Sequence, residues 1–210
     1  MMNGIDIASY QAGINIQQVK PDFVIIKATE GTNYVNPACN DQYDSAVKAG
    51  AKIGLYHFAT LNTSPEEQAH FFVANVKNYL LEGHALAALD WEADAITLGP
   101  EWAKRYLDTV YELISATPII YMSKSVTNAF DWSAVAQHYA LWGAQYADMN
   151  DVTEFQKDPW TDNLPWGAWV TPTIFQYSSS GRLPGWNGYL DLNKAYITQQ
   201  DWDKFTTKNS

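Results

Sequence analysis

Short apolar segments recur along this chain and are separated, over its first two thirds, by helical patterns. We expect eight of these segments to be strands, at residues 4–9, 22–28, 52–58, 85–92, 118–122, 139–144, 173–177 and 188–191. Strands that alternate with helices form a parallel sheet with crossover connections, and eight such strands close into a barrel. The last third lacks full helices between its strands. The sequence therefore predicts an α/β fold, an irregular barrel with about five β/α units followed by three bare strands.

Composition supports a single domain that spans residues 1–210, since 47% of the residues are hydrophobic and can form one sizeable core. The single cysteine, Cys39, excludes an internal disulfide framework. A net charge of -10 argues against nucleic acid and anionic membrane surfaces as partners. The chain opens without a basic segment followed by an apolar core, and no apolar run approaches the ~20 residues that span a bilayer. We therefore expect neither a signal peptide nor a membrane span.

The strand expected at residues 85–92 ends in two acids, Asp90 and Glu92. Side chains of a strand alternate between its two faces, so these two carboxyls should point to the same side. Their repulsion and partial burial should raise the pKa of one of them toward neutrality. A protonated carboxyl beside an ionised one is the arrangement that glycosidic bond cleavage requires. The alternative is an acidic strand end that simply meets solvent.

Other polar and aromatic residues also fall at expected strand ends, and in a parallel barrel those ends form the active-site mouth. The first and last strands become neighbours when a barrel closes, so Asp6 and Asp191 should lie close together. We therefore expect four carboxylates at one mouth. The other residues expected around it are Lys27, Glu30, Tyr56, His57, Tyr121, Trp142 and Gln176.

His57 has two further interpretations. It could be a hydrogen-bonded histidine of the rim, or it could join the acids in a metal site, as in barrel amidohydrolases or deacetylases. Such metal sites usually gather several histidines, but His70, His84 and His138 fall on helices or before strands, away from the mouth. We therefore expect no metal and no cofactor.

Six motifs occur in an order that resembles glycoside hydrolase family 25, the Chalaropsis-type lysozymes found in bacteria, fungi and phage endolysins. They lie at residues 4–11 (GIDIASYQ), 24–31 (VIIKATEG), 54–58 (GLYHF), 89–92 (LDWE), 175–177 (FQY) and 190–193 (LDLN). The resemblance covers nearly the whole chain. It implies a flattened, irregular, TIM-like (β/α)5(β)3 barrel and N-acetylmuramidase activity on bacterial peptidoglycan, at the β-1,4 bond between N-acetylmuramic acid and N-acetylglucosamine.

The resemblance also implies roles for single residues. Glu92 matches the general acid of the family, and Asp90, Asp6 and Asp191 match its other acidic residues. The spacing of Asp90 and Glu92 is similar to the D-x-E of substrate-assisted families such as chitinases, in which the 2-acetamido group of the substrate attacks and the configuration is retained. Direct attack by a carboxylate is the alternative mechanism. The residues expected around the acids would line the sugar subsites.

Two other functions remain open: a chitinase-like or endoglycosidase barrel, and a glycan-binding barrel without catalytic activity. The resemblance and the absence of a recognisable signal peptide suggest an endolysin that stays in the host cytoplasm until it is released to the cell wall. An extracellular enzyme whose sequence is truncated would look the same. We expect a monomer with no wall-binding module in these residues.

Overall fold

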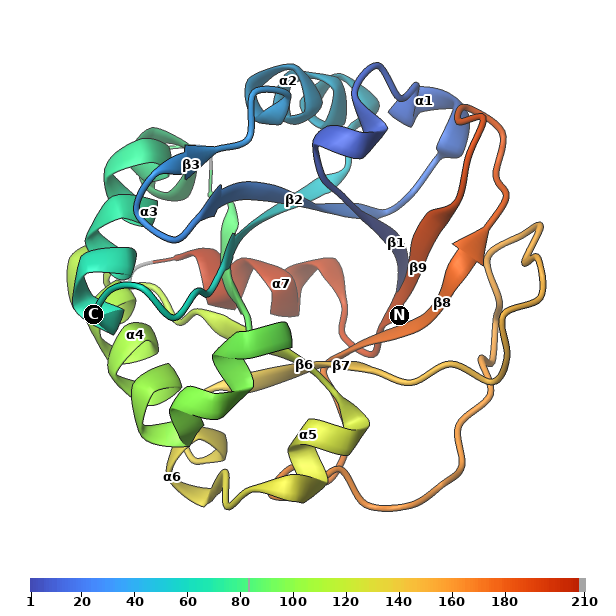
Figure 1. Ribbon diagram of the computed structural model, residues 1–210. Helices are drawn as coiled ribbons and strands as arrows, with labels where there is room; N and C mark the ends of the chain where they lie inside the picture. The colour runs from blue at the N-terminus through green and yellow to red at the C-terminus, as the bar shows by residue number, and fades with distance from the viewer. Residues whose placement is uncertain (83, 208–210) are drawn as a thin grey trace.

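Nine strands of the described chain form one sheet that closes on itself (Figure 1). The structure is a computed structural model that describes residues 1–82 and 84–207. The sheet order is β1-β9-β8-β7-β6-β5-β4-β2-β3, and an additional pairing of β1 with β2 closes the ring. The strands are β1 (Met2–Ile7), β2 (Phe23–Glu30), β3 (Tyr34–Val35), β4 (Lys52–Phe58), β5 (Leu86–Asp90), β6 (Ile119–Ser123), β7 (Ala140–Ala144), β8 (Ile174–Gly181) and β9 (Leu190–Ala195). Because β3 pairs only with β2 at the rim, the other strands make the barrel.

Helices follow each of the first five barrel strands. They are α1 (Ile16–Val19), α2 (Cys39–Ala49), α3 (Pro65–Leu81), α4 (Gly99–Ile114), and the pair α5 (Lys124–Ala129) and α6 (Ser133–Ala136). No helix of the described residues lies between β7 and β9, and α7 (Gln199–Thr206) follows the last strand. Short 3-10 turns lie at Ser9–Gln11 and Ala93–Leu98. The predicted barrel of five β/α units and three bare strands is confirmed.

The direction of the last strand differs from the prediction. The strand expected at residues 188–191 instead spans 190–195, and it runs antiparallel to both of its neighbours, β8 and β1. A parallel arrangement needs a long crossover connection, whereas the short segment 182–189 returns the chain directly as a hairpin. The beginning of β9, rather than its end, therefore lies at the mouth where the other barrel strands end.

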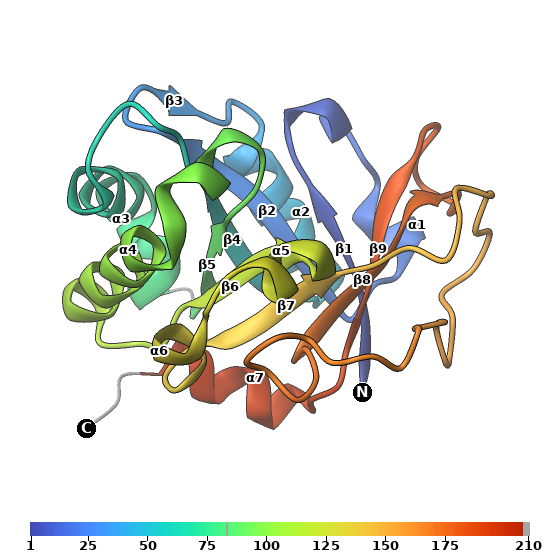
Figure 2. The same cartoon turned by 60° about the horizontal axis from the view of Figure 1, so that its bottom comes forward.

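Alternating side chains create two apolar layers, one inside the barrel and one between the strands and the helices. Phe23 and Ile25 of β2 face inward, whereas Val24 and Ile26 pack outward with the helices. The helix α7 lies across the end of the barrel opposite the mouth (Figure 2), and its buried Trp202 packs against Phe23 with ring centroids 5.1 Å apart. The lower end of the barrel is thus filled, and the upper end is left for polar residues.

Local sequence signals explain where several elements begin and end. Ser64 caps α3 by accepting a hydrogen bond from the Glu67 amide, and the Glu67 carboxylate accepts a hydrogen bond from the Ser64 amide in return. The segment 148–169, predicted to be a long loop, has only isolated bridges at Val152 and between Trp166 and Trp169. In the described part of the chain, no helix combines the length and apolarity needed to cross a bilayer.

Candidate active site

The alternation of β5 carries Asp90 and Glu92 into the barrel mouth. Leu86 and Ala88 belong to the inner apolar layer, and Asp90, the last residue of β5, continues this inward series. The backbone stays extended at Glu92, with φ -150° and ψ -171°. Trp91 between them is fully buried and packs in the outer layer. Both carboxyls therefore project to the same side, as the period of two predicts.

Asp6 and Asp191 lie directly opposite each other in the antiparallel pair of β1 and β9. Their carboxyl groups share a hydrogen bond. Asp6 Oδ2 also accepts hydrogen bonds from Gln176 Nε2 at 2.9 Å and from Asn193 Nδ2 at 2.7 Å. Two amide donors on one oxygen favour the ionised form of Asp6, so the shared proton belongs on Asp191.

Burial raises the pKa of each of the four acids. It brings the pKa of Asp6 to about 6 despite the amide donors, and with the nearby charge of Asp6 it brings the pKa of Asp191 to about 8. Burial, and then the charges of Glu92 and Asp6, hold the pKa of Asp90 well above its usual range. Burial also raises the pKa of Glu92, while the Lys27 ammonium partly offsets this. The mouth therefore holds protonated and ionised carboxyls together near neutral pH, which acid catalysis of glycoside cleavage requires.

The Asp6 carboxylate ends a chain of hydrogen bonds across the barrel. The hydroxyl of Tyr121 donates to Gln176 Oε1 at 2.9 Å, and the hydroxyl of Tyr146 donates to the same oxygen. With its oxygen occupied by two donors, the Gln176 amide turns its Nε2 toward Asp6. Asn193 is oriented in the same way, because its Oδ1 accepts the indole N–H of Trp142 at 2.8 Å.

Two members of this network, Tyr146 and Asn193, are absent from the residues predicted from the sequence. The alternation would have indicated both. Tyr146 follows the inward residues Trp142 and Ala144 at the same spacing, and Asn193 stands two residues after Asp191. Such polar partners are as important as the acids here, because they fix which carboxyl oxygen faces which donor.

The structure separates the residues predicted to bind substrate into two groups. Tyr56 and Tyr121 retain 8% exposure at the inner mouth, whereas Trp142 and Gln176 are 2% and 3% exposed and lie beneath the acids. Trp142 and Gln176 are thus committed to the hydrogen-bond network. Direct contact of these two side chains with a sugar stays a prediction.

His57 also differs from the prediction. It is fully buried, stacks on Tyr106, and is hydrogen-bonded at both ring nitrogens, to Thr29 Oγ1 at 2.8 Å and to Gln68 Oε1 at 3.0 Å. Neighbouring residues Tyr56 and His57 point to opposite faces of β4, so His57 faces the helices and cannot reach a sugar in the mouth. Of the alternatives, a hydrogen-bonded structural histidine fits this position, and neither nitrogen is free for a metal.

Lys27 and Glu30 meet at the rim. The Lys27 ammonium lies 2.6 Å from Glu30 Oε2 and 4.5 Å from the centroid of the Phe58 ring, and only 15% of the Lys27 side chain is exposed. The two residues therefore form an ion pair at the rim. Its cation stands close enough to Asp90 and Glu92 to lower the pKa of both.

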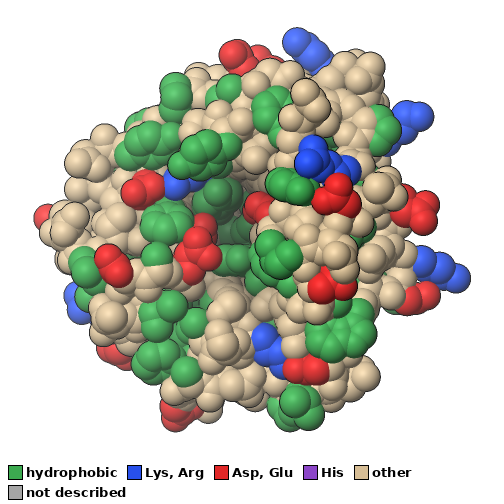
Figure 3. All heavy atoms as spheres, turned by 45° about the vertical axis from the view of Figure 1, so that its right-hand side comes forward, with side chains coloured by type: hydrophobic (Ala, Val, Ile, Leu, Met, Phe, Trp, Pro, Cys, Tyr) green, Lys and Arg blue, Asp and Glu red, His purple; other side chains and the backbone are tan. Residues whose placement is uncertain are grey.

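A cleft of about 770 Å³ opens beside Glu92. It passes Tyr121 and Tyr146 and continues between α5 and the segment 161–165. The space-filling view shows a hollow in this face of the molecule, bordered by acidic and hydrophobic side chains (Figure 3). An open cleft that leads to a cluster of acids can hold an extended polymer.

A closed α/β barrel whose strand ends carry an Asp-x-Glu pair, with carboxyls protonated near neutral pH, has the features of barrel glycoside hydrolases. Comparisons with known proteins agree with this class. A model described as Glycosyl hydrolases family 25 matches residues 5–186. The N,O-diacetylmuramidase of Chalaropsis sp is 29% identical over 211 residues, which cover 90% of this chain and 94% of that protein.

Two further similarities span most of the chain. Lysozyme M1 of Streptomyces globisporus is 29% identical over 209 residues, covering 92% of this chain and 67% of that protein. The crystal structure of the bacterial lysozyme from Streptomyces coelicolor has a TM-score of 0.79 and 27% identity, and it covers 97% of this chain and 96% of that one. The chain belongs to glycosyl hydrolases family 25, and it is a glycoside hydrolase.

Proposed function

We propose that this chain is an N-acetylmuramidase that hydrolyses the β-1,4 bond between N-acetylmuramic acid and N-acetylglucosamine in bacterial peptidoglycan. The observation that carries the proposal is the placement of Asp90 and Glu92 on one side of the mouth, beside the hydrogen-bonded pair Asp6 and Asp191. All four acids come from one chain, so a monomer carries a complete site. Its place of action would be the cell wall.

Glu92 is the proposed general acid. Burial raises the pKa of this carboxyl, which favours its protonated form, and Glu92 lines the open cleft, where a glycosidic oxygen can approach it. Transfer of this proton to the glycosidic oxygen accompanies cleavage of the bond between that oxygen and the anomeric carbon. The resulting Glu92 carboxylate can then take a proton from the attacking water, which restores the acid.

Asp90 is proposed to assist the 2-acetamido group of the muramic acid. Its Oδ1 is buried and has no hydrogen-bond partner in the described structure, so the carboxyl is not committed to a neighbouring side chain. The residue keeps 7% exposure at the mouth, where the exposed part of the carboxyl can accept the acetamido N–H. The acetamido oxygen would then bond to the anomeric carbon and give an oxazolinium ion, whose positive charge favours the ionised form of Asp90. Attack of water on the anomeric carbon reopens this ring with net retention. Tyr56, Tyr121, Lys27 and Glu30 would border the sugar subsites.

The test of this mechanism is a comparison of two probes. A thiazoline analogue of the oxazolinium should inhibit competitively, and Asp90→Asn should lower kcat far more than it weakens binding. A fluorinated sugar substrate should leave no ester on Asp90. Detection of such an ester by mass spectrometry would show direct attack by Asp90 instead of substrate assistance. Inversion of the anomeric centre would contradict both mechanisms. Faster cleavage of chitin oligomers than of cell walls would favour the chitinase-like alternative.

A further inference from the structure

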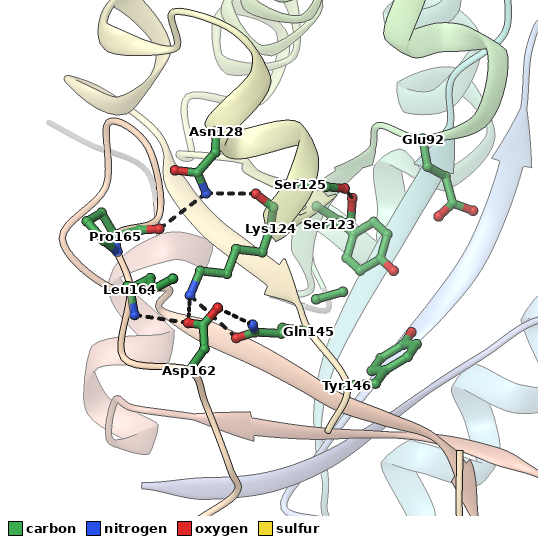
Figure 4. Close-up of a pocket in the computed structure, with 12 residues that line it drawn as sticks. Glu92, Ser123, Lys124, Ser125, Asn128, Gln145, Tyr146, Asp162, Leu164 and Pro165 are labelled. Carbon is green, nitrogen blue, oxygen red and sulfur yellow. Dashed lines mark hydrogen bonds and ion pairs between the residues drawn. The ribbon is translucent and has the colours of Figure 1, made fainter. Parts of the chain in front are cut away.

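The side of the cleft that lies across from Glu92, here called the outer wall, is lined by residues that have no role in the proposed mechanism. Figure 4 shows Lys124, Asp162 and Gln145 gathered across the cleft from Glu92, with Tyr146 between them. Ser123, Ser125 and Asn128 line the α5 side, and Leu164 and Pro165 form an apolar edge. A surface that combines hydroxyls, amides and a small apolar edge suits a sugar ring.

The position of the acids decides which part of a glycan lies here. Glu92 lines this cleft, whereas Asp6, Asp90 and Asp191 do not. The sugar that carries the reacting anomeric carbon must lie against Asp90, where positive charge develops. A cleft that begins at the general acid and leads away from the other acids therefore receives the sugar that departs with the glycosidic oxygen.

The wall is held by a partly buried ion pair. Lys124 is only 7% exposed, its ammonium contacts the Asp162 carboxylate, and it lies 4.8 Å from the centroid of the Trp166 ring. Gln145 Nε2 donates to the other oxygen of Asp162 at 2.7 Å. These contacts join the segment that carries Asp162 to α5 and to the end of β7.

Close packing fixes the same segment independently. A Cβ at Gly143 would lie 2.5 Å from the Trp166 ring, so only glycine on β7 allows this indole to pack there. Asn128 Nδ2 donates to the carbonyl of Pro165 at 3.2 Å. The wall is thus a fixed surface, and a sugar that binds to it does not need to order a mobile loop.

The wall offers no charge partner to an anionic occupant. The lining carries two acids, Glu92 and Asp162, and one lysine that is already paired. No unpaired cation of this lining is available for a carboxylate. The wall therefore suits the neutral sugar of the peptidoglycan repeat better than the one that bears the lactyl group.

Under the proposed function, N-acetylglucosamine is the sugar on the leaving-group side of the scissile bond, and this cleft receives it. We propose that the Lys124–Asp162 ion pair is the positioning contact that holds the outer wall of this sugar's site. This inference rests on the proposed function. It also gives the direction of the glycan across the mouth, with muramic acid over Asp90 and the departing N-acetylglucosamine toward α5.

The test uses two ligands whose sites differ. An N-acetylglucosamine thiazoline should occupy the site beside Asp90, and the borohydride-reduced disaccharide N-acetylglucosaminyl-N-acetylmuramitol should bind the cleft at the same time. In titration calorimetry with saturating thiazoline, Asp162→Asn and Lys124→Met should bind the disaccharide about 3- to 10-fold more weakly than wild type. Thiazoline affinity should not change. Asp162→Asn preserves shape, and it serves as the test if Lys124→Met fails to fold.

The matched control is Lys104→Met, which removes the ion pair with Asp108 on α4, away from the cleft. It should bind both ligands like wild type. Competition between the two ligands in wild type, unchanged disaccharide affinity in the folded variants, or an equal loss of thiazoline affinity would each overturn the inference. If wild type still cleaves peptidoglycan in those cases, only the inference fails. A wild type that binds neither ligand and releases no reducing ends would instead refute the proposed function.

Discussion

Asp6 and Asp191 occupy opposed positions in the antiparallel pair of β1 and β9, although they lie near opposite ends of the chain. The contact exists because β9 enters the barrel in the reverse direction and begins at the mouth. It brings two carboxyls into a single hydrogen-bonded pair beside Glu92, whose charge raises the pKa of both. This pair makes the stability of the barrel depend on pH.

The variant Asp191→Asn should remove part of that dependence. Burial raises the pKa of Asp191 from 3.8 to about 8, so between these values the folded chain holds a proton that the unfolded chain releases. Stability from this group is present below about pH 4 and is lost as the pH rises to about 8. Relative to wild type, the variant should gain roughly 1–3 kcal/mol between pH 4 and pH 8.

Urea unfolding of both proteins at these two pH values measures the difference. Asp203→Asn is a useful control, because Asp203 pairs with Lys52 near the other end of the barrel. If the free energy of unfolding changes equally with pH in wild type and in Asp191→Asn, Asp191 is ionised in the folded protein.

Lys27→Met should move the alkaline limb of the pH–rate profile to higher pH. Burial raises the pKa of Glu92 and the Lys27 ammonium partly lowers it, so removal of the ammonium should raise this pKa further. If Glu92 must be protonated to act, the enzyme will then stay active at higher pH. Initial rates on cell walls across the pH range give the profile.

The control variant Lys77→Met changes an exposed lysine of α3. It removes the same charge away from the mouth and should leave the pH–rate profile unchanged. The double variant Lys27→Met with Glu30→Gln separates the effect of the ammonium from that of an unpaired Glu30. A profile that stays in place in both Lys27 variants would assign the alkaline limb to a group other than Glu92.

His57→Leu should destabilise the fold without weakening substrate binding. The change leaves the buried Thr29 hydroxyl without its partner, at a cost of about 1–3 kcal/mol for an unsatisfied buried polar group, whereas Gln68 Oε1 keeps the hydrogen bond from the Thr60 amide. Urea unfolding should show this loss, and KM on cell walls should stay at the wild-type value. His70→Leu changes an exposed histidine and serves as the control. A raised KM with an unchanged free energy of unfolding would indicate instead that His57 contacts the substrate.

Much of the site could be predicted because a strand has a strict period. The inward direction of Asp90 and Glu92 follows from residues 85–92 alone, and the proximity of Asp6 and Asp191 follows from barrel closure. The same rule would have shown that His57 faces outward beside Tyr56. The expectation that every residue at a strand end faces the mouth instead placed His57 among the substrate-binding residues.

Other features depend on contacts between segments that are distant in sequence. Nothing local indicates that Trp142 uses its indole N–H to orient Asn193, which in turn donates to Asp6. The polar segment 148–169 likewise gives no sign that Asp162 will meet Lys124, because both residues look like ordinary surface charges. Hydrophobic patterns predict layers, whereas hydrogen-bond partners are set by the assembled fold.

Glu92 is proposed to protonate the glycosidic oxygen that follows N-acetylmuramic acid, and the identity of the new reducing end tests this role. Purified peptidoglycan would be digested, reduced with borohydride and examined by mass spectrometry, with Glu92→Gln as the matched control. This role predicts that wild type releases fragments that end in muramitol, and that a folded Glu92→Gln releases them roughly 100- to 10,000-fold more slowly. Fragments that end in glucosaminitol, or near wild-type release by the variant, would contradict it.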